Sequence, residues 1–316
     1  MVELDLGTPP VATHLMATST VALMFQVGAR TLGTIPKRLV RLSLSLADVL
    51  AGTQPELPPL PSDADGYLVT SLPETRLAGL IDRHVMALVR QRYSRYHVDL
   101  AAGEAAWLSG LSSTARTGIK RKAKKLAAAN DGLLDVRRYH RAEQFATFYP
   151  LARRVSAKTY QEKLLGSGLP ADPASVRALS ALAEEDGLRA WLVFLQDAPI
   201  AYLCCTADGD TLRYTYVGHD PVHSALSPGA VLQVEALRDL FAEGRFARFD
   251  FTEGEGQHKR QFSSAGTACV DVLLLRPTLA NRSTLLALRT FDAAIALAKR
   301  AATVPLVDRL AKKIRR

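Results

Sequence analysis

The chain has 316 residues, 48% of them hydrophobic and 22% charged, which is the balance of a globular protein and excludes a disordered one. No run of about eighteen apolar residues occurs, and Met1–Pro10 carries acids without an apolar stretch at leader spacing, so we expect neither a membrane-spanning helix nor a signal peptide. Three cysteines without a CxxC pair fit neither a disulfide framework nor a zinc site. We therefore expect a cytoplasmic protein that needs no metal.

The net charge of +9 is unevenly distributed. Residues 280–316 hold nine bases and two acids, so most of the excess lies at the end of the chain. Such a segment indicates contact with an anionic surface, which can be a phospholipid, a nucleic acid or an acidic partner.

The first half of the chain reads as mixed α and β, without a sequence repeat. Alternating apolar residues predict strands over 36–50, 67–72 and 95–100. A 3–4 spacing of leucine, isoleucine and valine predicts a helix over 74–93.

A second helix is predicted over residues 114–130, followed by a strand over 133–139. Bases crowd its outer faces, namely Arg116, Lys120, Arg121, Lys122, Lys124 and Lys125. This face is either simply solvated or binds the phosphate of a nucleotide, an RNA or a lipid. Few aromatic residues lie among the bases, which weakens the case for single-stranded nucleic acid.

The second half has a clearer pattern. Asp172 and Pro173 open a helix that Gly187 ends. Three strands, a helix and two further strands follow, over residues 188–195, 200–206, 211–217, 229–243, 245–251 and 268–275. Short Asp/Gly/Pro connectors between the first three strands predict antiparallel hairpins, and the order predicts an α+β sheet crossed by a helix.

The segment YTYVGHDPVHSALSPG, residues 214–229, joins a strand to a helix start. Ser227 is expected as the N-cap, Pro228 as the first helical residue, and Gly229 leaves room for close approach. Helix starts present backbone amides and a dipole to anions, so a diphosphate fits here; a well-capped helix without a ligand is the alternative.

The segment FDFTEGEGQHKRQF, residues 249–262, ends an apolar strand in acids, a histidine and a lysine. Asp250, Glu253, His258 and Lys259 just beyond a strand end suit acid–base chemistry, and the two glycines let the backbone bend around a ligand. The alternative is a charged, solvated turn.

Together with LSSTARTGIKRKAKKL and PIAYLCC, these segments resemble the GNAT-type acyltransferases called BioF2-like or CelD-like, relatives of the FemAB aminoacyl transferases. The resemblance runs roughly from Trp107 to Leu275. His258 stands where the family usually has tyrosine before the lysine. The usual GNAT diphosphate loop is absent, and the helix start at Ser227 takes its place.

The resemblance implies two GNAT-like halves with mixed, mostly antiparallel sheets flanked by helices. We expect a degenerate half over 1–140, an acyltransferase half over 141–278 and a basic amphipathic helical tail over 279–316. Acyl-CoA is the expected co-substrate, without a permanently bound cofactor, and an acyl carrier protein or an aminoacyl-tRNA is the alternative donor.

The implied reaction transfers the acyl group to an amine. Asp250 is the first candidate for the base, with Glu253 and His258 as alternatives, and Tyr216 is expected to bind the carbonyl or protonate the leaving thiolate. The expected donor-binding residues are Ser227, Gly229, Ala230 and Lys259.

The amphipathic basic tail indicates an anionic membrane surface and a peripheral place on the inner membrane, and nucleic acid is not expected. Since bacterial ceramide synthases resemble this group, a sphingoid-type lipid amine is the first candidate acceptor. The alternatives are an amino sugar in exopolysaccharide assembly, FemAB-like aminoacyl transfer, or a non-catalytic binding module.

Overall fold

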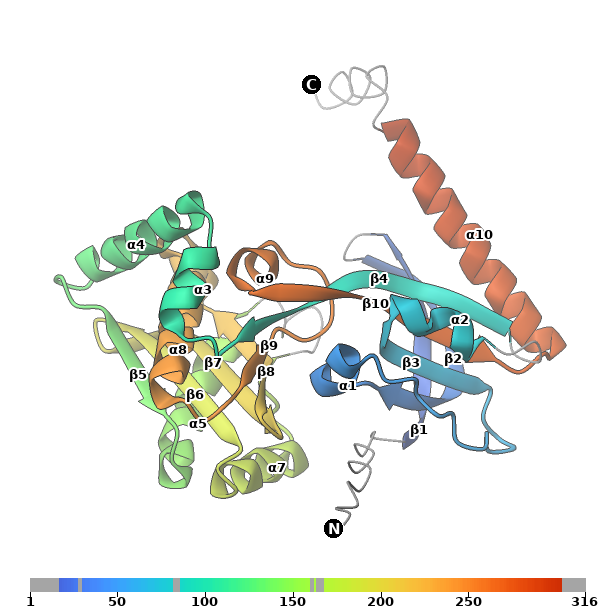
Figure 1. Ribbon diagram of the computed structural model, residues 1–316, viewed down its shortest axis with the longest axis horizontal. Coiled ribbons are helices and arrows are strands. Elements are labelled where there is room, and N and C mark those ends of the chain that lie inside the picture. Colours follow the sequence, from blue (N-terminus) through green and yellow to red (C-terminus); the bar gives the residue numbers. More distant parts are fainter. Residues whose placement is uncertain (1–16, 28–29, 82–85, 160–161, 163–167, 303–316) are drawn as a thin grey trace, which may run out of the picture. The chain divides into compact units, whose positions relative to one another are not determined.

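The computed structural model describes residues 17–27, 30–81, 86–159, 162 and 168–302, which form two compact units (Figure 1). The first unit holds the described residues up to 92 and from 268 onward, and the second holds the described residues of 93–267. Strands β4 (Met86–Asp99) and β10 (Ala265–Leu275) contribute residues to both units. The units therefore end elsewhere than at residues 140 and 278, because β10 pairs with β3 of the first unit. A division into a degenerate and an active half stays a prediction.

The first unit is built on strands in the order β1-β2-β3-β10-β4. Strand β1 (Ala17–Val27) pairs antiparallel with β2 (Arg30–Ser43), and β3 (Gly66–Pro73) pairs antiparallel with β10. Between them, β2 and β3 are parallel. The crossover between them contains the short helix α1 (Leu46–Ala51).

Helix α10 (Leu279–Ala302) packs onto this sheet through its first turns. Leu285 and Leu288 are buried against Leu23, Leu39 and Leu273 of the strands. Asn281 fixes the start of the helix, since its side chain accepts a hydrogen bond from Lys37 at 2.7 Å and donates one to the Arg276 carbonyl at 3.1 Å. The beginning of the expected tail is thus part of the folded unit, and residues 303–316 lie outside the described residues.

The second unit continues the strand order as β4-β9-β8-β7-β6-β5. Its strands are β5 (Asp135–Tyr139), β6 (Leu188–Leu195), β7 (Ala198–Asp208), β8 (Thr211–His219) and β9 (Arg248–Asp250). All neighbours are antiparallel except β8 and β9, which are joined by helix α8 (Pro228–Glu243) and run parallel. The prediction of mixed, mostly antiparallel sheets flanked by helices is confirmed.

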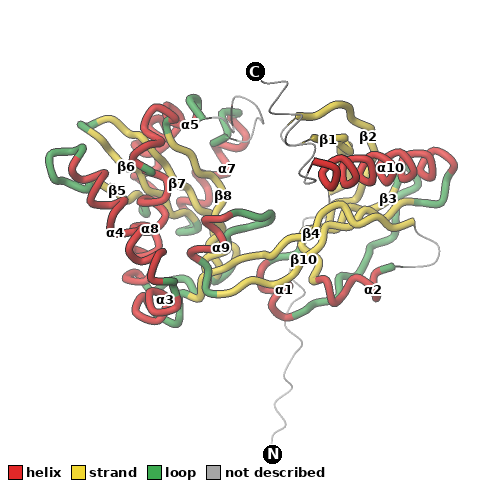
Figure 2. Tube along the Cα trace, turned by 90° about the horizontal axis from the view of Figure 1, so that it is seen from above, coloured by secondary structure: helices red, strands yellow, loops and turns green. Residues whose placement is uncertain are grey.

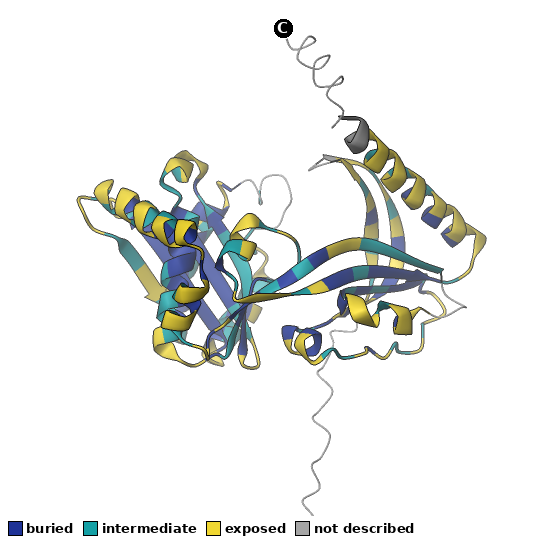
Figure 3. Cartoon of the chain, turned by 45° about the horizontal axis from the view of Figure 1, so that its top comes forward, coloured by how far each residue is buried: buried dark blue, intermediate teal, exposed yellow. Residues whose placement is uncertain are grey.

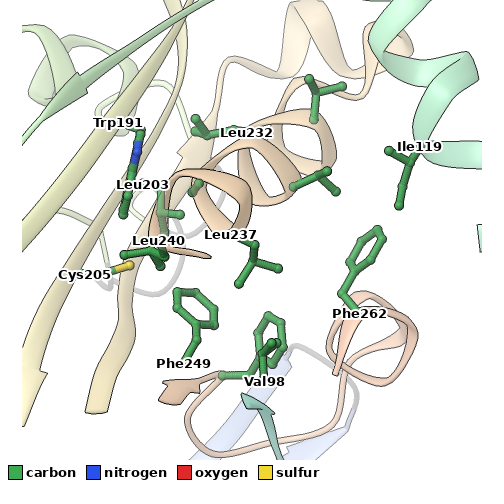
Figure 4. Packing of buried hydrophobic residues seen from close by; sticks show 14 of the residues in the cluster. Val98, Ile119, Trp191, Leu203, Cys205, Leu232, Leu237, Leu240, Phe249 and Phe262 are labelled. Carbon is green, nitrogen blue, oxygen red and sulfur yellow. The ribbon is translucent and has the colours of Figure 1, made fainter. Parts of the chain in front are cut away.

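Helices cover both faces of this second sheet, as Figure 2 shows by colour. Helices α3 (Glu104–Gly110), α4 (Ser113–Ala128) and α8 share one core with the sheet, seen from close by in Figure 4. Helices α5 (Phe145–Ser156) and α7 (Pro173–Glu184) share a second core on the opposite face. Strand β6 is consequently buried along nearly its whole length, dark blue in Figure 3.

The elements expected from the sequence are mostly present in the second unit. The expected helices over 114–130, 172–187 and 229–243 are confirmed as α4, α7 and α8. The structure adds β1, α3, α5 and the helix α9 (Gln257–Phe262), which the sequence patterns did not reveal.

Two expectations in the first half are wrong. The predicted helix over 74–93 is a turn of 3-10 helix, η1 (Glu74–Arg76), the single turn α2 (Leu77–Leu80), and then strand β4 from Met86 on. Pairing within the sheet overrides the helical spacing of its leucines. The predicted strand over 36–50 ends at Ser43, because Ser45 and Asp48 form a capping box that starts α1.

Within the part of the chain that the structure describes, every helix is too short or too polar to cross a membrane.

The packing of α10 gives a test with a matched control on the same helix. Leu288 is fully buried, whereas Leu286 is 64% exposed. We expect Leu288→Ala to lower the free energy of unfolding by about 2–5 kcal/mol, through lost burial and the cavity left behind. Leu286→Ala should change it by less than about 0.5 kcal/mol. Denaturant unfolding measures both, and equal small effects would show that α10 does not belong to the folded unit.

Candidate functional site

Strands β8 and β9 run next to each other for only a short distance. They pair from Thr211 to Arg213 on β8 and from Arg248 to Asp250 on β9. Among the described residues, the rest of β8 up to His219 has a ladder partner only on its other edge, where β7 lies. In open sheets with crossover helices, ligands bind in the crevice outside the carboxyl ends of such strands. The end of the β8–β9 pairing is therefore the candidate site.

A cavity of about 600 Å³ lies at this place, a volume within the usual range for small-molecule sites. Strand β8, the start of α8 and the segment after β9 line it. Five of the eight expected site residues contribute, namely Ser227, Gly229, Ala230, His258 and Lys259. The lining also contains residues outside the expected set, among them Lys122, Tyr214, His219, Gln233 and Thr252.

The start of α8 presents fewer free amides than the sequence suggests. Ser227 adopts left-handed backbone angles, φ 54° and ψ 45°, and its hydroxyl does not cap the helix. Its carbonyl accepts from the amides of Ala230 and Val231, and Pro228 has no N–H. Among the described residues, the Gly229 amide alone of these first positions has no backbone acceptor. A Cβ at Gly229 would lie 3.8 Å from His219 Nδ1, so a methyl group there would point towards this histidine of the lining without a clash.

Two lysines bring positive charge to the cavity. Lys122 reaches it from α4, the basic helix that the sequence singled out. Lys125 of the same helix donates to the Ala225 carbonyl at 2.9 Å and so ties α4 to η3 (Pro221–Leu226), the turn before α8. Lys259 donates to the Glu253 carbonyl at 2.5 Å, and burial lowers its pKa. Together with the Gly229 amide these cations suit a phosphate.

His258 contributes to the lining from α9. Its ring is 6.1 Å from that of Tyr214 and 6.4 Å from that of Phe251, centroid to centroid. Desolvation lowers its pKa below the ordinary value, and the charge of Lys259 lowers it further. The imidazole is therefore neutral at pH 7 and able to accept a proton.

His219, the second histidine of the lining, is oriented by Ser224. The Ser224 hydroxyl donates to the Pro221 carbonyl at 2.8 Å, so in its 3.0 Å contact with His219 Nε2 it acts as acceptor. Nε2 therefore carries a proton, and Nδ1 faces the region of Gly229. This histidine belongs to the anion-binding end of the cavity.

A bulge in β8 decides which tyrosine lines this cavity. Cys204 of β7 pairs with Tyr216 and the next residue, Cys205, pairs with Tyr214, so Thr215 is an extra residue in β8. Regular alternation would place both tyrosines on one face. The bulge places Tyr214 on the α8 face, and Tyr216 on the face covered by α5 and α7. Burial raises the pKa of Tyr214, which stays protonated.

Tyr216 instead lines a second cavity of about 640 Å³ on that other face. Two carboxylates share its lining, those of Glu162 and Asp172. Glu162 accepts two hydrogen bonds from Arg153, each 2.7 Å long, and Asp172 caps α7. Thr215 lines both cavities, so both border on the bulge.

Asp250 does not line the cavity, because its side chain is buried inside the protein. It is fully buried and accepts from Arg95 Nη2 at 2.7 Å, while Arg95 itself is 1% exposed. Burial disfavours the Arg95 charge, but the hydrogen bond and charge of Asp250, with the charge of Glu253, raise its pKa above the ordinary value. Asp250 also accepts from the Thr252 amide at 2.8 Å, and Thr252 has a positive φ of 60°. The carboxylate thereby fixes the turn that leads to His258.

One of the site residues that were not expected from the sequence, Gln233, does have a recognisable sequence signal. Gln233 interrupts the apolar stripe of a helix that was predicted, and such a lone polar residue on a buried face indicates a special role. Tyr214 carries no such signal, because a one-residue bulge cannot be read from apolar alternation. Arg95, the partner of Asp250, is 155 residues away along the chain.

Comparison with known proteins finds a sequence profile that matches the part of the chain holding this site. Residues 113–260, a little under half of the chain, match the sequence profile described as acetyltransferase (GNAT) domain. No curated protein sequence matches the chain.

Solved structures resemble the fold at low identity. The C-terminal domain of a putative lysylphosphatidylglycerol synthetase from Agrobacterium fabrum has 12% identity, coverage of 76% of this chain and 73% of its own, and a TM-score of 0.48. A GCN5-related N-acetyltransferase from Kribbella flavida has 16% identity, coverage of 69% and 71%, and a TM-score of 0.39. FemX has 10% identity, coverage of 80% and 88%, and a TM-score of 0.45.

The cavity between β8 and α8, from Lys122 to Lys259, lies wholly within the matched segment. The candidate site therefore lies within the segment that is similar to the acetyltransferase (GNAT) domain.

Proposed function

We propose that this protein is an N-acyltransferase that takes its acyl group from a coenzyme A thioester bound between β8 and α8. The observation that supports this best is the composition of the cavity. Its lining offers the Gly229 amide and two lysines, Lys122 and Lys259, together with a neutral histidine, His258, beside a tyrosine. The amide and the lysines suit the diphosphate of coenzyme A, and the histidine and the tyrosine suit the chemistry at its thioester.

The proposed reaction starts from a neutral amine. Its nitrogen attacks the thioester carbonyl carbon, a C–N bond forms, the C–S bond breaks and coenzyme A leaves as a thiolate. His258 takes the proton that the amine loses, and the Tyr214 phenol protonates the thiolate. The proton held by His258 then restores Tyr214, so neither group is consumed.

Asp250 and Glu253 have positioning roles in this proposal. Asp250 is buried against Arg95, so it does not face the amine, and the Glu253 carboxylate lies 3.7 Å from the same guanidinium. Their contribution is to hold the turn from Thr252 to His258. Tyr216, by contrast, belongs to the acceptor side.

We place the amine acceptor in the second cavity, on the other face of β8. Glu162 and Asp172 give it the negative charge that attracts a protonated amine, and the pKa of each carboxyl is lowered by its hydrogen bonds. Since Thr215 lines both cavities, donor and acceptor would meet at the bulge.

For the acceptor, a sphingoid-type lipid amine as in bacterial ceramide synthesis is our first proposal, with the protein peripheral on an anionic membrane. Helix α10 leaves Leu279, Leu286 and Leu297 exposed, and residues 280–316 carry nine bases. An amino sugar and FemAB-like aminoacyl transfer are the alternatives. A panel of these amines, with release of the coenzyme A thiol as readout, decides among them.

The donor site is tested at Gly229. We expect isothermal calorimetry to detect coenzyme A binding to the wild type, and Gly229→Ala to weaken it at least tenfold, because the methyl group projects towards His219 and narrows the cavity beside the free amide. The fold should tolerate this change, since the added carbon meets no atom closer than 3.8 Å. Gly110→Ala, at a glycine with open space around it, is the control. A wild type that binds no coenzyme A would refute the proposed function.

The base is tested by the pH profile. A lowered pKa keeps His258 neutral at pH 7, so kcat/KM should hold at neutral pH and decline only as the pH drops below about 6.5. His258→Gln should reduce the rate by about 10²–10⁴-fold and remove this decline. His223→Gln, at a residue outside the cavity lining, should keep both the wild-type rate and the decline at acidic pH. An unchanged acidic limb in His258→Gln would assign the base elsewhere.

The support under the site is tested at Asp250. We expect Asp250→Ala to lower the free energy of unfolding by about 3–5 kcal/mol, because the buried Arg95 loses its carboxylate partner. Asp208→Ala, at an exposed acid, should cost less than about 0.5 kcal/mol. Asp250→Asn retains a hydrogen-bond acceptor, so it distinguishes the two roles. Loss of turnover in a stable Asn variant would make Asp250 the base.

A further inference from the structure

The outer face of α4 carries positive charge that the protein does not neutralise. No acid occurs in the sequence between Glu104 and Asp131, a span that holds six bases. Five of them are exposed, and we call these five the basic face: Arg116, Lys120, Arg121, Lys124 and Lys125. In the parts of the chain that the structure describes, none of the five forms an ion pair, whereas Arg137 and Arg138 of β5, the next strand along the chain, each pair with a carboxylate. The charge of the basic face is thus available to a partner.

The stability of the helix does not explain this charge. Arg116, Lys120 and Lys124 follow one another at intervals of four residues, so their side chains are neighbours on the helix surface. Arg121 and Lys125 have the same spacing, and like charges at this spacing destabilise a helix. Arg116 and Lys125 each donate to a backbone carbonyl at 2.9 Å. Lys120, Arg121 and Lys124 make no side-chain hydrogen bond with any other described residue, so these three cations project from the fold without a partner there.

The basic face borders the proposed donor cavity. Lys122, the sixth base of the span, lines that cavity from α4, and Lys125 is bonded to η3 through the Ala225 carbonyl. On η3 the side chain of Val222 is 83% exposed, close in sequence to Ser224 of the lining. A protein that docks here meets cations and an apolar side chain together, which is the combination that protein interfaces use. It would also lie at the edge of the cavity.

The chemistry of the face selects an acidic protein as the partner. An amphipathic helix that enters a bilayer exposes its apolar residues, but the large apolar residues of α4, Ile119 and Leu126, are buried in the core. Single-stranded nucleic acid requires aromatic residues among the bases, and the sequence of α4 contains none. An acidic protein surface requires neither, because complementary charge steers and orients it.

The chemistry of the cavity selects a carrier protein among acidic proteins. At the start of α8, the Gly229 amide alone is free of a backbone acceptor among the described residues. A single amide suits the one phosphate of a phosphopantetheine arm as well as it suits the diphosphate of coenzyme A. Coenzyme A and an acyl carrier protein present the acyl thioester on this same arm, so one cavity can serve both donors.

We propose that the basic face of α4 is a docking surface for an acidic acyl carrier protein, which presents its thioester to the cavity beside it. The inference rests on the proposed function, because it takes this cavity as the donor site. It adds a protein-bound donor to coenzyme A and assigns the recognition of that donor to residues outside the cavity.

The inference is tested with an acidic bacterial acyl carrier protein loaded with a hexadecanoyl chain, and with hexadecanoyl-CoA beside it. The triple variant Lys120→Gln, Arg121→Gln and Lys124→Gln removes three charges and keeps good helix formers. Calorimetry at about 0.05 M salt should show carrier binding weakened about tenfold or more, because the charges that attract the carrier are gone. Binding of hexadecanoyl-CoA should stay within about twofold, since Lys122 and the cavity are intact. Salt of about 0.3 M should weaken carrier binding to the wild type by screening.

A second triple variant is the matched control. Arg141→Gln, Arg154→Gln and Arg177→Gln remove the same charge at exposed positions outside both cavity linings, so carrier binding should equal that of the wild type. The melting temperature of the α4 variant should stay equal or rise, because its substitutions remove like-charge neighbours.

The inference is overturned if the wild type binds hexadecanoyl-CoA but not the carrier, or if both triple variants lose carrier binding equally, which is attraction by net charge alone. Equal losses for the carrier and for hexadecanoyl-CoA would assign the basic face to the nucleotide and likewise overturn it. Vesicles of phosphatidylglycerol and phosphatidylcholine that bind the wild type in place of the carrier, and bind the α4 variant poorly, would assign the face to a membrane. A wild type that binds no coenzyme A thioester refutes the proposed function itself, and that result is distinct from the loss of carrier binding alone.

Discussion

The buried pair of Arg95 and Asp250 determines where the parallel pairing of β8 and β9 stops. Asp250 is the last residue of β9, and its carboxylate accepts both from Arg95 and from the Thr252 amide. The second bond holds Thr252 at a positive φ, so the chain leaves the sheet at once. A β9 that continued along β8 would fill the space now left to the cavity. An ion pair without solvent contact thus produces an opening that the sheet alone would close.

The same strand β8 is irregular on its other edge, and this irregularity assigns its side chains to two faces. Because Thr215 is an extra residue, Tyr214 faces α8 while Tyr216 faces α5 and α7. Each tyrosine lines its own cavity, one beside lysines and one beside carboxylates. Opposite charges on the two sides suit a reaction between an anionic donor and a cationic acceptor. The bulge allows one strand to present one phenol to each cavity.

The sequence predicts the elements around the site better than the side chains within it. Short Asp/Gly/Pro connectors fix the hairpins of β6, β7 and β8, and Pro228 with Gly229 marks the start of α8, because these signals are local. Asp250 was expected to be the base since acids after a strand suit that role. Its pairing with Arg95 depends on strand β4, much of which the periodicity of its leucines had assigned to a helix. Long-range pairing and a one-residue bulge leave no local pattern.

The proposal of His258 as the base draws on how other titratable groups of the site are held. Glu253 and Asp250 face Arg95, and Lys259 is fixed to a backbone carbonyl. His219 shares its Nε2 proton with Ser224 at the anion-binding end. His258 is the proposed base, since burial and the charge of Lys259 lower its pKa and its ring lies beside that of Tyr214. In the family that this segment resembles, a tyrosine usually stands at this position, which binds but cannot readily accept a proton at neutral pH. In the proposed reaction, the histidine here makes a hydrogen-bonding position a basic one.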